Sequence, residues 1–156
     1  MGSEPIAEGL FTWPSEEPQL IGRRCGACGA VTFPARGGCG RCGSTELEQH
    51  LLGRRGILWT WTSQGFPPKA PFTGNATFSL DTVPWFVGLV ELPGELRVES
   101  LLVGVTQEAL EFGMPLRLVV VPFRTDDDGR EVVTFAFTPD VPDEQSSSRE
   151  TETAHA

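Results

Sequence analysis

Hydrophobic and polar residues alternate along the second half of the chain with the period of two that is typical of β-strands. In the first such segment, residues 56–63, the side chains of Ile57, Trp59 and Trp61 fall on one face. This pattern predicts that the two tryptophans pack in a core, with an exposed stacking platform as the alternative. Four further apolar segments follow at residues 83–92, 95–104, 114–124 and 130–139. The chain is therefore expected to form five strands.

Turn-forming residues separate these segments. Pro93-Gly94 is a turn dipeptide between the second and third strands, and the DDDG stretch at residues 126–129 predicts a hairpin between the last two. TQEALEFG, residues 106–113, predicts one short helical turn that begins at Thr106 as its N-cap and ends at Gly113. Five strands with a short helix between the third and fourth match the order of elements in an OB-fold barrel. A plain β-sandwich is the alternative.

The fold class expected from the alternation is all-β, with a five-stranded OB-fold barrel. Ahead of the barrel, two Cys-x-x-Cys pairs between residues 25 and 42 have the spacing of metal ligands and predict a small zinc ribbon. The first region is an arm rich in Pro, Glu and Gly, where Pro14 and Pro18 argue against a long helix. The last region has almost no apolar residues and is expected to be a disordered acidic tail. The predicted regions are the N-terminal arm 1–21, the zinc ribbon 22–53, the OB-fold 54–139 and the tail 140–156.

All four cysteines of the chain form two Cys-x-x-Cys pairs, Cys25/Cys28 and Cys39/Cys42, with ten residues between the pairs. A tetrahedral Zn(II) takes four thiolates, and a glycine follows each pair, where positive φ is often required. Because all four ligand positions would be filled by sulfur, the site is expected to be structural and not catalytic. Two disulfides, or iron in the same four-sulfur site, are the alternatives.

The formal net charge of −9 is unevenly distributed. Residues 56–139 carry ten acidic against five basic residues, and Lys69 is the only lysine of the chain. Phosphate affinity needs clustered Lys and Arg, so general polyanion binding is disfavoured, although single-stranded nucleic-acid binding is kept as the alternative function. Arg23, Arg24 and Arg36 lie close to the cysteines in sequence. They are expected to balance the thiolate charge, with the phosphates of coenzyme A as the alternative partner.

Residue types used in catalysis are scarce. The chain has no tyrosine and two histidines, of which His50 is expected to be a solvated linker residue and His155 lies in the tail. With the cysteines assigned to metal, no Cys–His pair is left. No apolar run reaches the roughly 18 residues of a membrane span, and the N-terminus lacks the pattern of a signal peptide. The cytoplasm is therefore the expected compartment.

A long connection rich in proline and aromatic residues, residues 63–85, follows the first strand. Loops of this length inside a compact domain are usually functional. The connection is interpreted as a docking or ligand loop, with packing over the barrel mouth as the alternative. The residues expected to make contacts are Phe66, Pro67, Pro68, Phe72, Phe78 and Trp85.

The ordered series RCGACGAVTFP, CGRCGS, GRRGILWTWT, VPWFVGLVEL, EFGMPLRLVV and VTFAFTP resembles a family of rubredoxin-like zinc-ribbon plus OB-fold proteins. That family was long catalogued as a domain of unknown function, and it accompanies thiolases and other acyl-CoA enzymes. The resemblance covers residues 10–139. It implies a non-catalytic subunit that binds a thiolase-fold enzyme in a hetero-oligomer, with acyl-CoA at the shared interface.

The opening segment EGLFTWPSEEPQLIGRRC is most similar to the branch that partners steroid side-chain aldolases. The resemblance thus implies a role in an aldolase or thiolase complex that acts on CoA thioesters such as steroid side-chain intermediates. Many members of the family begin with a helical hairpin. Pro14 and Pro18 fall where that hairpin would run, so this chain departs from the pattern there.

Overall fold

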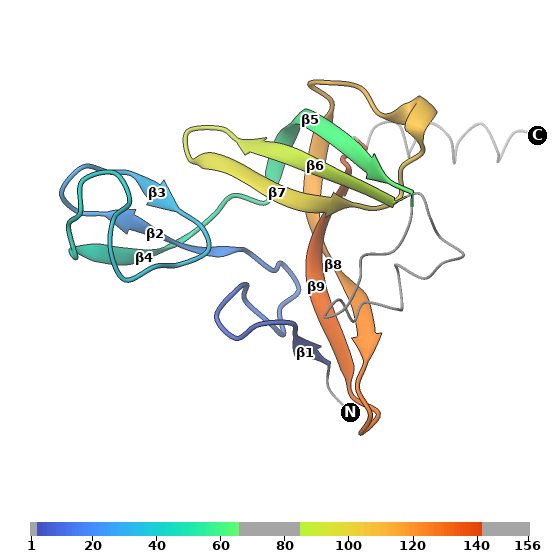
Figure 1. Cartoon of the computed structure of the whole chain (residues 1–156), viewed down its shortest axis with the longest axis horizontal. Coiled ribbons are helices and arrows are strands. Elements are labelled where there is room, and N and C mark those ends of the chain that lie inside the picture. The colour runs from blue at the N-terminus through green and yellow to red at the C-terminus, as the bar shows by residue number, and fades with distance from the viewer. Residues whose placement is uncertain (1–2, 66–84, 142–156) are drawn as a thin grey trace, which may run out of the picture.

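The structure, a computed structural model, describes residues 3–65 and 85–141 and arranges them in two β-sheets that lie side by side (Figure 1). The smaller sheet has the order β3-β2-β4. Its strands are β2 (Ile21–Cys25), β3 (Val31–Thr32) and β4 (Leu47–Leu51). The larger sheet has the order β1-β9-β7-β6-β5-β8, and an additional pairing of β9 with β8 closes it.

The closed part of the larger sheet is a five-stranded barrel. Its strands are β5 (Arg55–Gln64), β6 (Trp85–Leu92), β7 (Leu96–Leu102), β8 (Pro115–Thr125) and β9 (Glu131–Pro139). Neighbouring strands are antiparallel except β7 and β9, which are parallel. This is the topology of an OB-fold, so the predicted fold class is confirmed and the β-sandwich is excluded.

The predicted turns occur where the sequence places them. Gly94 (φ +75°) and Gly129 (φ +85°) adopt the left-handed conformation in the two hairpin turns. The helical turn is shorter than expected, because it is a 3₁₀ helix, η2 (Gln107–Ala109), of three residues. Thr106 caps it as predicted, since its Oγ1 accepts a hydrogen bond from the Ala109 backbone N–H at 3.3 Å.

A β-bulge in β5 changes which tryptophan is buried. The register of β5 against β6 shifts between Leu58 and Thr60, so Trp59 is the extra residue. The extra residue inverts the alternation, and Trp61 joins the core on the same side as Leu58. Trp59 is left 49% exposed. The prediction that Ile57, Trp59 and Trp61 share one face, and that Trp59 lies in the core, is therefore wrong.

One hydrophobic core extends from the barrel to the base of the ribbon sheet. Phe11 and Leu20 of the N-terminal arm and Leu52, just after β4, are almost completely buried in the same cluster as the barrel side chains. A backbone hydrogen bond also joins these two segments, because the Leu52 N–H donates to the Leu20 carbonyl at 2.9 Å. On the ribbon side, Phe33 packs edge-on against Phe135 of β9 with ring centroids 5.7 Å apart. The ribbon is thus fixed to the barrel by apolar contacts.

The turn between β6 and β7 adds a polar connection to the ribbon. Glu95 accepts a hydrogen bond from the Gly53 backbone N–H at 2.9 Å, and its other carboxylate oxygen lies 2.9 Å from Nε2 of His50. His50 is a residue of β4, paired with Gly22 in the sheet. The prediction that His50 is a solvated linker residue is wrong, because His50 lies in a strand and its ring contacts the Glu95 carboxylate. The local sequence could not show this contact, since the two residues are 45 positions apart.

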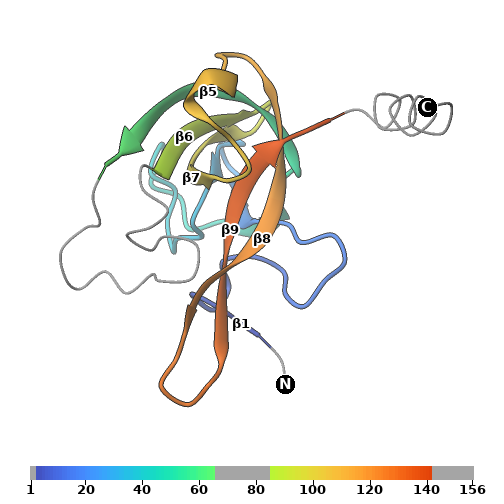
Figure 2. The same ribbon diagram turned by 90° about the vertical axis from the view of Figure 1, so that its right-hand side faces the viewer.

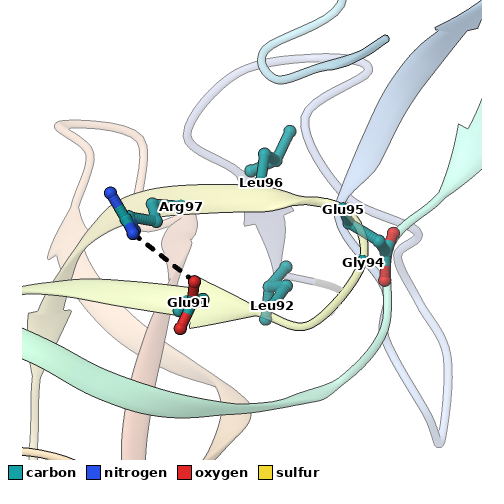
Figure 3. Close-up of a pocket in the computed structure, with 6 residues that line it drawn as sticks. All are labelled: Glu91, Leu92, Gly94, Glu95, Leu96 and Arg97. Carbon is teal, nitrogen blue, oxygen red and sulfur yellow. Dashed lines mark ion pairs between the residues drawn. The ribbon is translucent and has the colours of Figure 1, made fainter. Parts of the chain in front are cut away.

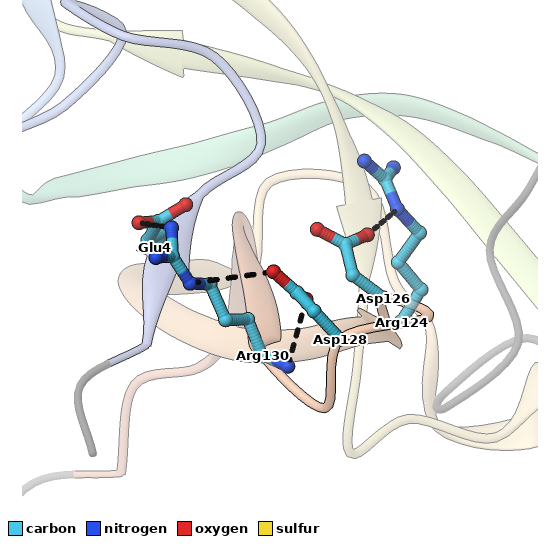
Figure 4. A network of polar contacts seen from close by, with 5 residues as sticks. All are labelled: Glu4, Arg124, Asp126, Asp128 and Arg130. Carbon is cyan, nitrogen blue, oxygen red and sulfur yellow. Dashed lines mark hydrogen bonds and ion pairs between the residues drawn. The ribbon is translucent and has the colours of Figure 1, made fainter.

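The β8–β9 hairpin projects beyond the barrel, and β1 (Glu4–Pro5) runs beside it (Figure 2). Polar contacts gather near its tip (Figure 4). Arg130 reaches Glu4 at 2.7 Å and Asp128 at 3.5 Å, while Arg124 pairs with Asp126 at 3.0 Å. Exposed ion pairs contribute at most about 1 kcal/mol each, so these contacts orient the hairpin and β1 more than they stabilise them.

We expect Glu95→Ala to lower the free energy of unfolding by about 1–3 kcal/mol, because the Gly53 N–H and the His50 ring lose a half-buried acceptor. Chemical denaturation at neutral pH with zinc present would measure this difference. Glu99→Ala, an exposed glutamate of β7, is the matched control and should change stability by no more than about 0.5 kcal/mol. Equal effects of the two substitutions would contradict a role of Glu95 in joining the ribbon to the barrel.

Candidate metal centre

Two turns of the ribbon aim the four cysteines at one point. Cys25 is the last residue of β2, Cys28 follows in the next turn, and Cys39 and Cys42 lie in the loop between β3 and β4. The four Sγ atoms all lie within 4.8 Å of one another. The Cys25–Cys42 and Cys28–Cys39 sulfur pairs are 3.6 and 3.7 Å apart. Zinc–sulfur bonds of about 2.3 Å in a tetrahedron require sulfur–sulfur distances of about 3.8 Å, so the cluster fits a metal ion.

The same distances exclude the disulfide alternative. A disulfide needs sulfur atoms about 2.05 Å apart. None of the four cysteines is paired in a disulfide.

Each Cys-x-x-Cys turn closes in the same way. The Gly29 N–H donates to the Cys25 carbonyl at 2.9 Å, and the Gly43 N–H donates to the Cys39 carbonyl at 2.8 Å. Both glycines have positive φ, +77° and +79°, as the sequence predicts. A Cβ atom at either position would meet no neighbouring atom, so backbone conformation and not space requires glycine there.

Backbone N–H groups stabilise the thiolate form of two of the cysteines, Cys25 and Cys39. The backbone N–H groups of Cys42 and then Arg41 lower the pKa of Cys39 to about 6. The pKa of Cys25 is lowered mainly by the Cys28 N–H. Although the Ser44 N–H acts in the opposite direction, the neighbouring Cys25 and Cys28 sulfurs, with burial, raise the pKa of Cys42 to about 12. Four crowded sulfurs therefore ionise together only around a cation.

The all-sulfur donor set leaves no ligand position open to water or substrate. Cys25 and Cys39 are buried, and Cys28 is half-buried. A catalytic zinc site keeps one position open, whereas closed four-sulfur sites are structural. The chemistry of this site is to hold the ribbon together.

Two of the three arginines near the cysteines point to opposite faces of the ribbon sheet. Arg23 and Arg24 are consecutive residues of β2, so their side chains leave the sheet on opposite faces. Arg24 is paired with Glu48 across the ladder, and Arg36 lies in the loop after β3. All three are exposed, and none makes an ion pair with another residue in ranges 3–65 and 85–141. Their contact with coenzyme A stays a prediction.

Most of the predicted contact loop falls outside the described residues, namely Phe66, Pro67, Pro68, Phe72 and Phe78. Trp85 is the first residue of β6, where it is 9% exposed and packs against Phe123. Trp59 lies at the surface, as in the alternative interpretation of an exposed stacking platform, whereas Trp61 packs against the core. The alternation of apolar and polar residues along β5 could not predict the bulge at Trp59. A bulge depends on how the strand pairs with its neighbour, here β6.

Purified protein is expected to contain one zinc per chain, and Cys25→Ser or Cys39→Ser should remove the metal and unfold the ribbon. Elemental analysis and the chemical shifts of ribbon residues would measure both effects. Lowering the pH should release zinc, because protons compete with the metal for the thiolates. Ser44→Ala, beside the last ligand, is the matched control and should retain the metal. Red protein containing iron, or a cysteine variant that stays folded without metal, would contradict this assignment.

Comparisons with known proteins match both parts of the structure. Residues 13–48 match the family model of the rubredoxin-like zinc ribbon domain of ChsH2, and residues 49–121 match that of its C-terminal OB-fold domain. The four-sulfur cluster and the zinc-ribbon match together identify structural Zn(II) as the cofactor. In the described part of the chain, no helix has the length and apolar character needed to cross a membrane.

Two relatives match this chain over most of their own length, and a third is a longer protein. A DUF35 domain-containing scaffold protein of Methanocaldococcus jannaschii is 32% identical over 120 residues, which cover 76% of this chain and 78% of that protein. The benzoylsuccinyl-CoA thiolase subunit BbsA of Thauera aromatica is 29% identical over 120 residues, covering 77% and 76%. A probable enoyl-CoA hydratase alpha subunit of Thermomonospora curvata is 29% identical over 132 residues, which are 85% of this chain but 37% of that longer protein.

A solved structure, the Ltp2-ChsH2(DUF35) aldolase, superposes with a TM-score of 0.58 at 26% identity and covers 79% of this chain and 86% of the matched chain. The sequence matches extend without a gap from the arm through the ribbon into the barrel. The chain belongs to the DUF35 family of ChsH2-type proteins, which combine a rubredoxin-like zinc ribbon with an OB-fold.

Proposed function

We propose that this chain is a non-catalytic accessory subunit of a thiolase-fold enzyme that acts on CoA thioesters. The observation that carries the proposal is the set of relatives that match it over most of their own length. One is a thiolase subunit and another is a scaffold protein. The match to the Ltp2-ChsH2(DUF35) aldolase, which covers 86% of the matched chain, supports the same role.

The geometry of the ribbon and barrel is consistent with a supporting role. The metal site has no open ligand position, and the ring of His50 is held by Glu95. The ribbon is fixed to the barrel by a shared core, so the chain presents a rigid surface to a partner. In this proposal the partner carries the acid–base residues, and this subunit holds the partner in its active shape.

The aldolase match supports a retro-aldol version of the proposal, in which the complex cleaves a β-hydroxyacyl-CoA. Steroid side-chain intermediates are the substrates that the sequence resemblance suggests. Acyl-CoA would bind at the shared interface. The opposite orientation of Arg23 and Arg24 disfavours a common phosphate site for them. In this proposal these two arginines and Arg36 balance the charge of the thiolates. Four free cysteines in a metal site support a reducing compartment such as the cytoplasm.

The test is affinity purification of the tagged, zinc-loaded chain from its host, followed by mass spectrometry and size-exclusion chromatography. We expect a thiolase-fold protein in near-equal molar amount. That enzyme, produced alone, should turn over acyl-CoA substrates slowly or be unstable, and adding this chain should restore its activity. Zinc-stripped chain is the control and should restore nothing. Recovery of nucleic acid, or of no thiolase-fold protein, would contradict the proposal.

A further inference from the structure

The outer surface of three barrel strands carries an exposed tryptophan that is held by an arginine. Alternation along β6 sends Phe86, Gly88 and Val90 into the barrel, so the residues between them face outward. We call the outward side of β5, β6 and β7 the β5–β7 face. Six of its residues carry the following inference: Trp59, Thr62, Val87, Leu89, Arg97 and Glu99.

Trp59 is held in one orientation on this face. The bulge turns its ring outward, and the Arg97 guanidinium lies 3.7 Å from the ring centroid. Arg97 is held in turn by Glu91, the residue opposite it in the ladder, at 3.5 Å (Figure 3). An aromatic ring fixed before binding loses little conformational entropy when a partner covers it. Tryptophan and arginine are also the residue types most enriched in interface hot spots.

Two hollows beside β6 suit single side chains. A cavity of about 260 Å³ lies on the β5–β7 face. A second cavity of about 290 Å³ lies where this face meets β9, because Thr134 and Phe135 also line it, and the two cavities share Val87 and Glu99. The first is also lined by Thr62 and Leu89. Both lie below the roughly 300–1,000 Å³ of typical small-molecule pockets. Shallow, partly apolar hollows of this size fit side chains that project from a protein surface.

The charged residues of the β5–β7 face indicate which class of partner is complementary to it. Arg97 is already paired, while Glu99 makes no ion pair with the residues in ranges 3–65 and 85–141. In OB-folds the second and third strands, here β6 and β7, often form the ligand face. A nucleic acid would need unpaired cations there, whereas Arg97 is paired with Glu91 and Glu99 adds a carboxylate without an ion pair among the described residues. A protein surface with lysines and arginines around an apolar centre is the complementary partner.

We infer that the β5–β7 face is the docking surface for the thiolase-fold partner, whose apolar side chains cover Trp59, Val87 and Leu89 inside a basic rim that meets Glu99. This inference rests on the proposed function and adds the location and chemistry of the interface.

The first experiment measures the affinity of the full-length chain for the partner enzyme identified by co-purification, using titration calorimetry. Trp59→Ala should raise the dissociation constant about 30-fold or more, which is the loss expected for a hot-spot residue. Leu51→Ala, at a residue of the ribbon that is 38% exposed, is the matched control and should leave affinity unchanged. Zinc content and the unfolding midpoint of each variant verify that the fold is intact.

Charge reversal provides a second, independent test. Glu99→Lys should slow association and weaken binding, because it opposes the basic rim of the partner. Glu48→Lys, in β4 of the ribbon, should have no such effect. If the wild-type chain binds the enzyme and both face variants bind as tightly, the docking surface is wrong while the proposed function stands. If the wild-type chain captures no thiolase-fold protein, both are wrong. Fluorescein-labelled single-stranded DNA that binds the wild type but not Trp59→Ala would also overturn the inference.

Discussion

Metal–thiolate bonds supply what the ribbon lacks in hydrophobic core. Between residues 23 and 51, Cys25 and Cys39 are the only side chains that are fully buried, and both are ligands. A segment of this size cannot remove enough apolar surface from water to offset the entropy of ordering its backbone. Four sulfurs around one ion replace that missing burial, and they join the end of β2 to the loop that leads into β4.

The position of the ribbon on the barrel depends on a second, ordinary interaction. Leu20 and Leu52, which border the ribbon sheet on either side, are completely buried in the barrel core. Glu95 adds hydrogen bonds from a barrel turn to the same junction. The metal therefore fixes the shape of the ribbon, whereas hydrophobic burial fixes its orientation. A partner that contacts both sheets meets one rigid body.

Much of the fold could be predicted because its signals are local. Five strands, two hairpin turns and the cap at Thr106 follow from alternation and turn chemistry within a few residues. The metal site was equally accessible, since the cysteine spacing and the glycine after each pair already specify two turns. Features that depend on distant parts of the chain could not be predicted. Trp59 faces outward because of how β5 pairs with β6, and His50 is held by a carboxylate far away in sequence.

β1 is a two-residue strand that pairs with β9 and so ends the larger sheet on that side. β1 lies at the edge of the larger sheet, where an open strand would offer unpaired N–H and C=O groups to a second molecule. Its two residues are poor templates for further pairing. Pro5 has no N–H to donate, and Glu4 brings a charge that Arg130 holds at 2.7 Å. The start of the chain thus protects the protruding hairpin against edge-to-edge aggregation.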